Sequence, residues 1–223
     1  MPDSSSLTLY SYWRSTAAYR VRMGLNLKGL EATQHPVHLV RDGGEQFDEE
    51  YTRLNPQQLV PTLVHGDRVI TQSLAILEYL DEAFEGPALL PDDPAGRARV
   101  RSLALLVACD IHPINNLRVL KYIGEELGAD EAGRKNWIHH WIGTGLDALE
   151  KRLASDQETG TFCHGSQPGL ADCCLLAQVY NARRFECNES GWPVIRRICE
   201  AMEALPAIQM AAPENQPDAP GVQ

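Results

Sequence analysis

The chain has 223 residues, of which 43% are hydrophobic and 22% charged, a length and composition that suit one large or two small globular domains. Its formal net charge of −10 at pH 7 argues against nonspecific binding to nucleic acid or to an anionic membrane. No segment approaches the about 18 unbroken apolar residues of a membrane span, and residues 1–6 lack the basic and apolar parts of a signal peptide, so we expect a cytoplasmic protein.

The first expected elements are a short strand and a helix. Residues 7–10 read as a strand. Apolar residues then recur at helical spacing at Ala18, Val21 and Leu25, and Gly29 ends the helix. Ser15 and Thr16 therefore fall where the helix begins. The first turn of a helix has unpaired N–H groups and the positive end of the helix dipole, so a hydroxyl there can cap the helix or help to hold an anion such as a thiolate. This segment alone leaves both interpretations open.

Up to about residue 85, strands and helices continue to alternate. Val37 and Leu39 predict a second strand, which Pro36 keeps near an edge of the sheet. Residues 48–54 predict a short helix. Both elements fit a small α/β domain in which helices pack on a sheet.

A β-hairpin and a further helix complete this region. Residues 62–65 and 68–71 read as two strands joined by a tight turn at Gly66-Asp67. Ser73 is a plausible N-cap for the helix that follows. The apolar face of that helix comprises Leu74, Leu77, Leu80 and Phe84.

After a linker rich in prolines, residues 85–94, strand signals almost vanish. Residues 95–108 predict a helix that Pro113 kinks or interrupts and that resumes through about Leu127. Further helices are expected over three ranges: 137–153, 171–185 and 193–205. The tail, residues 213–223, contains three prolines and few apolar residues, so we expect it to be extended or disordered.

The six cysteines show neither a disulfide-like nor a zinc-like spacing. Most fall in apolar helical stretches, where we expect them to be small core residues of a reduced protein. His139 and His140 are adjacent, and neighbouring residues diverge on a helix, so we expect no metal site there.

A second group of residues bears on Ser15. If the Val60–Pro61 bond is cis, the main chain of Val60 points outward and can pair with a peptide ligand like one more strand. Gln72-Ser73 opens the next helix, whose first N–H groups and Ser73 hydroxyl can hold a carboxylate. Each feature alone also suits an ordinary turn or cap. Together they offer an anchor for an anionic sulfur, for a peptide backbone and for an α-carboxylate, which are the parts of glutathione.

Several motifs resemble one known family. They are Tyr10–Ser15, Tyr19–Arg22, Leu54–Gln57 with Val60-Pro61, Gln72–Ile76, Cys109–Pro113 and Ala182–Phe185. Over roughly residues 7–218 the chain resembles the zeta class of glutathione transferases, and within it the bacterial maleylacetoacetate and maleylpyruvate isomerases. The resemblance implies a thioredoxin-like glutathione-binding domain of class α/β at residues 7–86, an all-α substrate domain at 92–212, an extended tail at 213–223, and a homodimer.

The resemblance also implies a reaction, the glutathione-dependent isomerisation of maleylacetoacetate to fumarylacetoacetate in tyrosine and phenylalanine breakdown. The thiolate adds to the cis double bond of the maleyl group, the bond rotates, and elimination leaves the trans product. The reaction needs a thiolate at neutral pH, although a free thiol has a pKa of about 8.5. It also needs cations that hold the carboxylates and the developing enolate charge. Three alternatives remain: a maleylpyruvate isomerase of gentisate breakdown, a zeta-class transferase, and a non-catalytic interaction protein, which would tend to lose the hydroxyl at residue 15.

The expected site residues carry over from the family position by position. Ser15, Arg14 and Arg184 are the expected catalytic residues, with Ser15 as the thiolate-stabilising serine. The expected substrate ligands are Arg14, Arg118 and Arg184, since a guanidinium can bind a carboxylate through two hydrogen bonds. The expected glutathione ligands are Ser15, Thr16, Ala17, Gln46, Val60, Pro61, Gln72, Ser73, His112 and Asn116.

Some positions depart from the family pattern or admit another interpretation. Ala17 stands where the family usually has Cys, and Gly169 stands where a Ser or Thr would complete a reciprocal helix cap with Asp172. His112 also suits a helix-kink residue beside a proline. Arg20 and Arg22 lie within the first helix and are expected to be solvated or to face a dimer partner.

Overall fold

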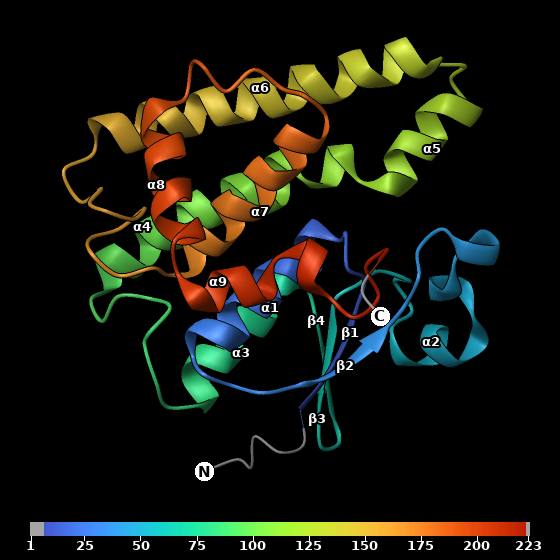
Figure 1. Ribbon diagram of the computed structural model, residues 1–223, viewed down its shortest axis with the longest axis horizontal. Coiled ribbons are helices and arrows are strands. Elements are labelled where there is room, and N and C mark those ends of the chain that lie inside the picture. Colours follow the sequence, from blue (N-terminus) through green and yellow to red (C-terminus); the bar gives the residue numbers. More distant parts are fainter. Residues whose placement is uncertain (1–6, 222–223) are drawn as a thin grey trace. The chain divides into compact units, whose positions relative to one another are not determined.

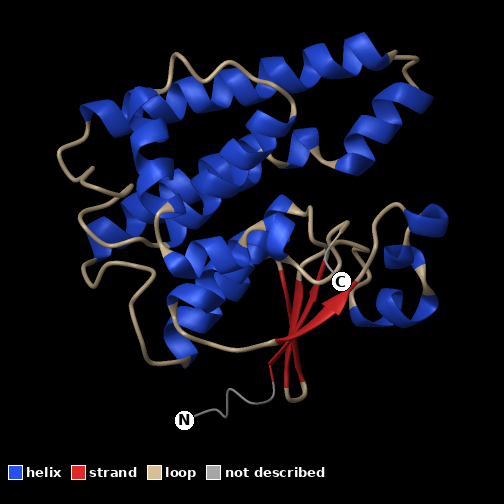
Figure 2. Ribbon diagram, in the orientation of Figure 1, coloured by secondary structure: helices blue, strands red, loops and turns tan. Residues whose placement is uncertain are grey.

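The computed structural model describes residues 7–221 of the chain, which form two compact units. Unit 1 contains the chain up to Leu90 together with the segment from Glu203 onward, and unit 2 contains Pro91–Met202. Within the described residues, strands occur in unit 1 alone and unit 2 is helical, as the colours of Figure 2 show. This division confirms the fold class that the sequence predicts.

The sheet of unit 1 has four strands in the order β2-β1-β3-β4. Their bounds are Leu7–Ser11 (β1), Thr33–Pro36 (β2), Thr62–His65 (β3) and Arg68–Thr71 (β4). β1 pairs in parallel with β2 and antiparallel with β3, and β3 and β4 form the predicted hairpin with the predicted bounds. Gly66 has a φ of 56° at the first turn position, a conformation that glycine adopts without steric cost and that suits a tight hairpin.

The edge strand differs in range from its prediction. β2 lies at the edge, as Pro36 indicates, but it ends at that residue, so the strand expected at Val37 and Leu39 is wrong. These two side chains pack instead into a small apolar cluster with Tyr12 and Val60. The alternating apolar residues Val37 and Leu39 therefore indicate burial here and not a paired strand.

Helices pack on this sheet, as Figure 1 shows. Their bounds in unit 1 are Thr16–Leu27 (α1), Glu49–Leu54 (α2), Ser73–Ala83 (α3) and Pro206–Ala211 (α9). α1 contacts both α3 and α9. The core between sheet and helices comprises Leu7, Leu9, Val21, Leu25, Leu63, Ile76 and Leu80. Because α1 has neighbours on more than one side, it is buried nearly all round, and its arginines are enclosed with its apolar residues.

The end of the chain folds back onto unit 1, unlike the extended tail and the boundary at residue 212 that the sequence predicts. A 3₁₀ turn at Pro213–Asn215 follows α9, and the side-chain amide of Gln216 donates to the carbonyls of Met210 and Ala212 at 3.1 and 2.9 Å. Asp218 accepts a hydrogen bond from a residue 205 positions earlier. Composition cannot reveal such distant partners, so it predicts an extended or disordered tail where long-range hydrogen bonds hold the segment.

Unit 2 is a helical bundle. Its α-helices are Pro94–Leu105 (α4), Leu117–Glu125 (α5), Glu131–Ser155 (α6), Leu170–Arg184 (α7) and Pro193–Glu203 (α8). Between α4 and α5 lie a π-helical turn at Leu106–Ile111 and a 3₁₀ turn at Pro113–Asn115, so the interruption predicted at Pro113 is confirmed. At the start of α7, the Asp172 carboxylate accepts from the main-chain N–H groups of Gly169 and Cys163 at 2.9 and 2.7 Å. The cap therefore works without a Ser or Thr at residue 169.

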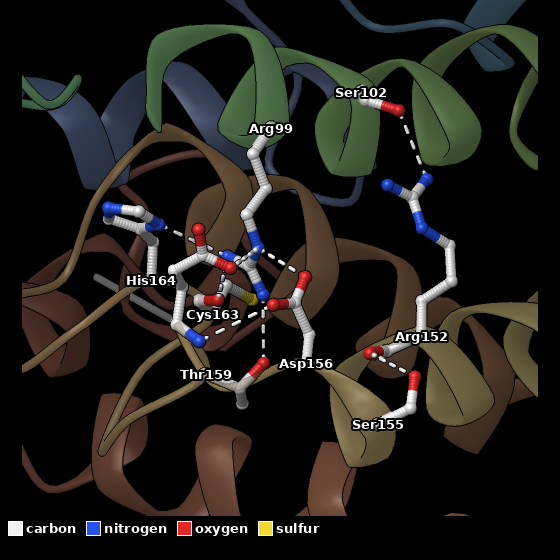
Figure 3. Close-up of polar contacts among 9 residues, drawn as sticks. Arg99, Ser102, Arg152, Ser155, Asp156, Thr159, Cys163 and His164 are labelled. Atoms are coloured by element: carbon white, nitrogen blue, oxygen red, sulfur yellow. Dashed lines mark hydrogen bonds and ion pairs between the residues drawn. The ribbon is translucent and has the colours of Figure 1, made fainter. Parts of the chain in front are cut away.

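By length and hydropathy alone, the helical run Pro94–Glu125 could cross a membrane, with a mean hydropathy of 1.3 over its most apolar window. Arg99 on this run is half-buried and makes polar contacts with the segment that follows α6, as Figure 3 shows. Its guanidinium donates to Asp156 Oδ2 at 2.5 Å, to Thr159 Oγ1 at 2.8 Å and to the Cys163 carbonyl at 2.7 Å. Hydrogen bonds from Glu158 and Arg99 lower the pKa of Asp156 to about 2. Arg99 thereby ties α4 to the loop between α6 and α7.

Candidate active site

The turn between β1 and α1 carries Ser15, the residue expected to stabilise a thiolate. The Ser15 N–H donates to the Tyr12 carbonyl at 2.9 Å and closes a four-residue turn. Ser15 is also the N-cap of α1, because its Oγ accepts from the Ala18 N–H at 3.2 Å. A hydroxyl has a donor proton in addition to its acceptor positions. The two interpretations of Ser15 are therefore compatible, since capping uses an acceptor position and leaves the proton for an anion.

The surroundings of Ser15 favour negative charge. α1 is 12 residues long and has no acidic residue in its first turn, so its dipole and free N–H groups act on the turn without opposition. Arg14 is half-buried, and its guanidinium carbon lies 5.5 Å from the ring centre of Trp13 and 6.0 Å from that of Tyr12. The rings hold a cation beside Ser15.

The next two positions differ in exposure. Thr16 is buried in the first turn of α1, whereas Ala17 is half-buried. Ala17 brings no thiol to the position where the family usually has Cys. Any chemistry that this family position supplies through sulfur is therefore missing from this chain.

The main chain of Val60 is positioned to pair with another strand. The Val60–Pro61 bond is cis. The residues on either side are fixed, because the Leu59 carbonyl accepts from Tyr51 Oη at 2.6 Å and from Asn55 Nδ2 at 2.7 Å, while Asn55 also donates to Thr62 Oγ1. Among the hydrogen bonds of the described residues, none uses the N–H or C=O of Val60. A fixed and unpaired peptide unit of this kind suits the main chain of a peptide ligand.

The start of α3 differs in detail from its prediction. The N-cap is Gln72, with a φ of 69° and no side-chain cap, so Ser73 is the first helical residue and the expected cap at Ser73 is wrong. Ser73 Oγ accepts from Arg20 Nη1 at 3.2 Å, and the Gln72 amide donates to Gln57 Oε1 at 2.8 Å. The end of an 11-residue helix without a side-chain cap, next to a buried arginine, suits a carboxylate.

Gln46 lies in a 3₁₀ turn at Glu45–Phe47 and is buried. Its amide nitrogen donates to the Leu39 carbonyl at 3.4 Å, and its Oε1 has no partner among the described residues. A buried acceptor without a partner costs free energy, which an N–H of a ligand can recover. Gln46 therefore fits the ligand role that the family resemblance implies.

Two arginines of α1 are buried, so the expectation that Arg20 and Arg22 are solvated or face a partner is wrong. Arg22 donates to Ser11 Oγ at 3.1 Å and to the Trp13 carbonyl at 2.9 Å. The sequence carried a signal for this residue. Arg22 stands four positions after Ala18 and three before Leu25, which places it on the apolar face of the helix.

The remaining predicted ligands belong to unit 2. His112 joins the π-helical turn to the 3₁₀ turn, as the kink interpretation expects. Asn116 is the N-cap of α5, where its Oδ1 accepts from the Arg118 N–H at 3.4 Å. Arg118 itself is exposed in the first turn of α5. The predicted set is thus divided, with Arg14 through Ala17, Gln46, Val60, Pro61, Gln72 and Ser73 in unit 1 and the other four residues in unit 2.

Arg184 lines a cavity of about 460 Å³ between α5, α6 and the end of α7. Part of the lining is apolar, and the cations Lys121, Arg134 and Lys135 share the lining with three glutamates. The Arg184 guanidinium carbon lies 4.5 Å from the centre of the Phe185 ring. The structure thus groups Arg184 with lysine and arginine side chains that no motif singles out. Helix spacing alone gave no signal for them.

Arg183, the neighbour of Arg184, has a different role. Its Nε donates to Glu189 Oε1 at 2.9 Å and ties the end of α7 to the following turn. His139 Nε2 lies 2.6 Å from the Phe185 carbonyl and also holds this end of α7. The choice of Arg184 over Arg183 as the candidate ligand therefore agrees with the contacts in unit 2.

Comparisons with known proteins complete the description. The family model "Glutathione S-transferase, N-terminal domain" matches residues 5–82. The chain is 50% identical to a probable maleylacetoacetate isomerase of Vibrio cholerae, over 96% of this chain and 99% of that protein. A holo structure of a zeta-class maleylpyruvate isomerase superposes with a TM-score of 0.92, at 47% identity over 95% of this chain and 99% of that chain. A maleylacetoacetate isomerase from Methylobacterium extorquens AM1, solved with bound malonate and GSH, has a TM-score of 0.92 at 41% identity, over 96% of this chain and all of that one, 100%.

Proposed function

Since the chain belongs to the zeta class of the glutathione S-transferase family, we propose that it is a glutathione-dependent isomerase that converts maleylacetoacetate to fumarylacetoacetate. The observation that carries the proposal is Ser15, which caps α1 through its oxygen and keeps its proton available for a sulfur anion. A non-catalytic relative would need only the cap, whereas the remaining donor proton of the hydroxyl suits an anionic sulfur.

The residues of unit 1 fit glutathione. Val60 offers the N–H and C=O that have no partner among the described residues, for the cysteinyl unit. The start of α3 with Gln72 and Ser73 offers N–H groups for the γ-glutamyl carboxylate. Gln46 offers a buried acceptor. Glutathione, when bound, supplies the thiolate that adds to the double bond of the substrate and leaves after the bond has rotated.

Each residue near the sulfur has a distinct task. Ser15 donates a charge-assisted hydrogen bond to the thiolate, and the N-terminus of α1 adds its positive potential. Together they lower the pKa of the bound thiol toward neutral pH. Arg14 supplies a positive charge next to Ser15 for a substrate carboxylate or for the enolate charge that develops during addition. Thr16 and Ala17 line the same first turn.

Substrate binding is proposed for arginines on both units. Arg184 belongs to a cluster with Lys121, Arg134 and Lys135, in which four cations outnumber the three glutamates of the same cavity, in a chain of net charge −10. Such a cluster offsets the repulsion that an acidic protein exerts on a diacid. Arg118 and the pair His112 and Asn116 are proposed as further ligands. The bound malonate of the Methylobacterium extorquens protein supports a diacid substrate, since malonate is a dicarboxylate.

The second candidate is maleylpyruvate isomerisation, favoured by the 47% identity to a maleylpyruvate isomerase. The test follows the ultraviolet absorbance of maleylacetoacetate and maleylpyruvate, each with and without glutathione. We expect conversion only with glutathione, whose concentration stays constant. A tenfold preference corresponds to about 1.4 kcal/mol in the transition state and assigns the substrate. Conversion at equal rates without glutathione, or stoichiometric loss of glutathione, would refute the proposal.

A homodimer and a cytoplasmic location are also proposed. Both are supported by the resemblance to glutathione transferases. Sedimentation of the purified chain measures the assembly, and a mass near twice 24.7 kDa is the expected result.

A further inference from the structure

The C-terminal segment contacts the turn that carries Arg14 and Ser15. The main-chain N–H of Trp13 donates to Asp218 Oδ2 at 2.9 Å, across 205 positions of sequence. The carbonyl of the same residue accepts from Arg22 Nη2 at 2.9 Å. Both main-chain polar groups of Trp13 are thus held by side chains from outside the turn.

The residues behind these contacts form one structure, which we call the strap and define as residues 206–218. Arg22 reaches the strap, since its Nε donates to the Ala211 carbonyl at 3.1 Å. One turn later on α1, Asn26 donates to the Ala207 carbonyl at 2.9 Å. Gln216 closes the strap on itself through its two bonds to main-chain carbonyls. The strap is therefore anchored along α1 before Asp218 reaches the turn.

The position of Trp13 explains why this anchoring bears on chemistry. Trp13 is the second residue of the turn that the Ser15 N–H closes on the Tyr12 carbonyl. Two hydrogen bonds on one residue restrict its φ and ψ, and so fix the direction in which the chain continues to Arg14 and Ser15. A charge-assisted hydrogen bond weakens steeply when its donor is displaced or tilted, so the Ser15 hydroxyl needs this fixed direction.

We propose that Asp218 is a positioning residue for the thiolate site: through the Trp13 N–H, its carboxylate sets the turn geometry that presents Ser15 to the bound sulfur. The inference rests on the proposed function of Ser15. A carboxylate suits this task because its bond to a main-chain N–H is stronger than one between neutral groups. The contact also makes the last residues of the chain part of the glutathione-binding unit.

The test compares Asp218→Ala, Asp218→Asn and the control Gln209→Ala. Gln209 donates to the Glu203 carbonyl at 3.0 Å, so the control removes one side-chain hydrogen bond of the same segment without reaching the turn. We expect Asp218→Ala to lower kcat about tenfold and to raise the pKa of bound glutathione thiol, with the KM for glutathione changed less. Asp218→Asn should recover much of the loss, because its amide oxygen still accepts. Gln209→Ala should match the unaltered protein.

A second readout needs no ligand and no turnover. Amide hydrogen exchange of Trp13 in the unliganded protein should become at least about tenfold faster in Asp218→Ala and stay unchanged in Gln209→Ala. Faster exchange with unaltered kcat and thiol pKa would make the strap purely structural and overturn the inference. If Asp218→Ala does not fold, Asp218→Leu carries the test, because leucine keeps the branched shape of the side chain but has no acceptor for the Trp13 N–H. An unaltered thiol pKa and exchange rate in that variant would count against the inference.

The variant Ser15→Ala separates this failure from failure of the proposed function. A large effect of Ser15→Ala together with none of Asp218→Ala refutes the strap alone. An unchanged pKa of the bound glutathione thiol in Ser15→Ala refutes the role of Ser15. The inference on Asp218 then fails as well, because Asp218 is proposed to act by positioning Ser15.

Discussion

Replacement of Ser15 by alanine removes two interactions at once, and the structure allows their separation. Ser15 Oγ accepts the Ala18 N–H at 3.2 Å, and a lost N-cap costs about 0.5–2 kcal/mol of stability. The same hydroxyl would donate to the glutathione thiolate, where a hydrogen bond to a charged group contributes about 1.5–3 kcal/mol. The first loss concerns folding and the second concerns the chemistry of the sulfur.

The free energy of the lost hydrogen bond to the thiolate can be expressed as a change in the pKa of the glutathione thiol. Because 1.36 kcal/mol corresponds to one pKa unit, the pKa of the bound glutathione thiol should rise by about one to two units in Ser15→Ala. At neutral pH the thiolate fraction then falls about 10- to 100-fold, and kcat falls with it. Glutathione affinity should change far less, because Val60, Gln72 and Ser73 hold the rest of the tripeptide in the proposed arrangement.

The assay titrates the ultraviolet absorbance of the thiolate in the glutathione complex, with calorimetry for affinity and thermal unfolding for stability. Asp93→Ala is the matched control. Asp93 caps α4 by accepting the Gly96 N–H at 2.8 Å, so its loss should lower the melting temperature similarly and leave the thiol pKa unchanged. Ser15→Thr, which keeps a hydroxyl, should retain most activity. A Ser15→Ala protein that melts like the control and has the thiol pKa of the unaltered protein would reduce Ser15 to a helix cap and refute the reasoning.

Three further predictions concern unit 2. Arg184→Ala should raise the KM for the diacid substrate at least about tenfold and leave glutathione binding unchanged, because a guanidinium–carboxylate pair is lost. The control Arg183→Ala should lower the melting temperature and change the KM less. Steady-state kinetics in which Arg183→Ala has the larger effect on KM would exchange the roles of the two residues. Asp156 has its pKa lowered to about 2, so its stabilisation is present above the unfolded pKa near 3.8 and is lost as the pH falls toward 2. Chemical unfolding across this window should show a smaller loss of stability in Asp156→Asn, and parallel curves would contradict the lowered pKa of Asp156. Asp172→Ala leaves two main-chain N–H groups unpaired at a site where the carboxylate is buried, and at about 1–3 kcal/mol each we expect a loss of about 2–6 kcal/mol in the free energy of unfolding; a loss below about 1 kcal/mol would show that water replaces the carboxylate.

Local patterns predict the elements of this fold well when the determinants lie within a few residues. The hairpin is predicted to the residue, because alternation and the turn at Gly66-Asp67 are both local. The break at Pro113 is likewise a property of one residue. The prediction places the second strand too late in the chain. Val37 and Leu39 are apolar because they pack into a cluster with Tyr12 and Val60, and an alternating apolar pattern does not distinguish such packing from a strand.

The candidate site follows the same division. Ser15, Val60 and Gln72 lie at the ends of elements, where turn and cap chemistry marks them in the sequence. The role of Ser73 changes because the left-handed φ of Gln72 moves the cap by one residue, and no propensity indicates that a glutamine will adopt this conformation. The cations around Arg184 come from two other helices, α5 and α6, so only the packed unit reveals them.

The residues that support the turn at Ser15 are the part that the sequence conceals most completely. A charged side chain on a helix ordinarily indicates exposure to solvent. Arg22 is nevertheless buried, because four hydrogen bonds to β1, the turn and the strap offset its desolvation. An acidic residue in a proline-rich tail ordinarily indicates disorder, yet Asp218 is held by a main-chain N–H near the other end of the chain. Motifs therefore identify the groups that do chemistry, whereas the groups that fix their geometry are defined by contacts across nearly the whole sequence.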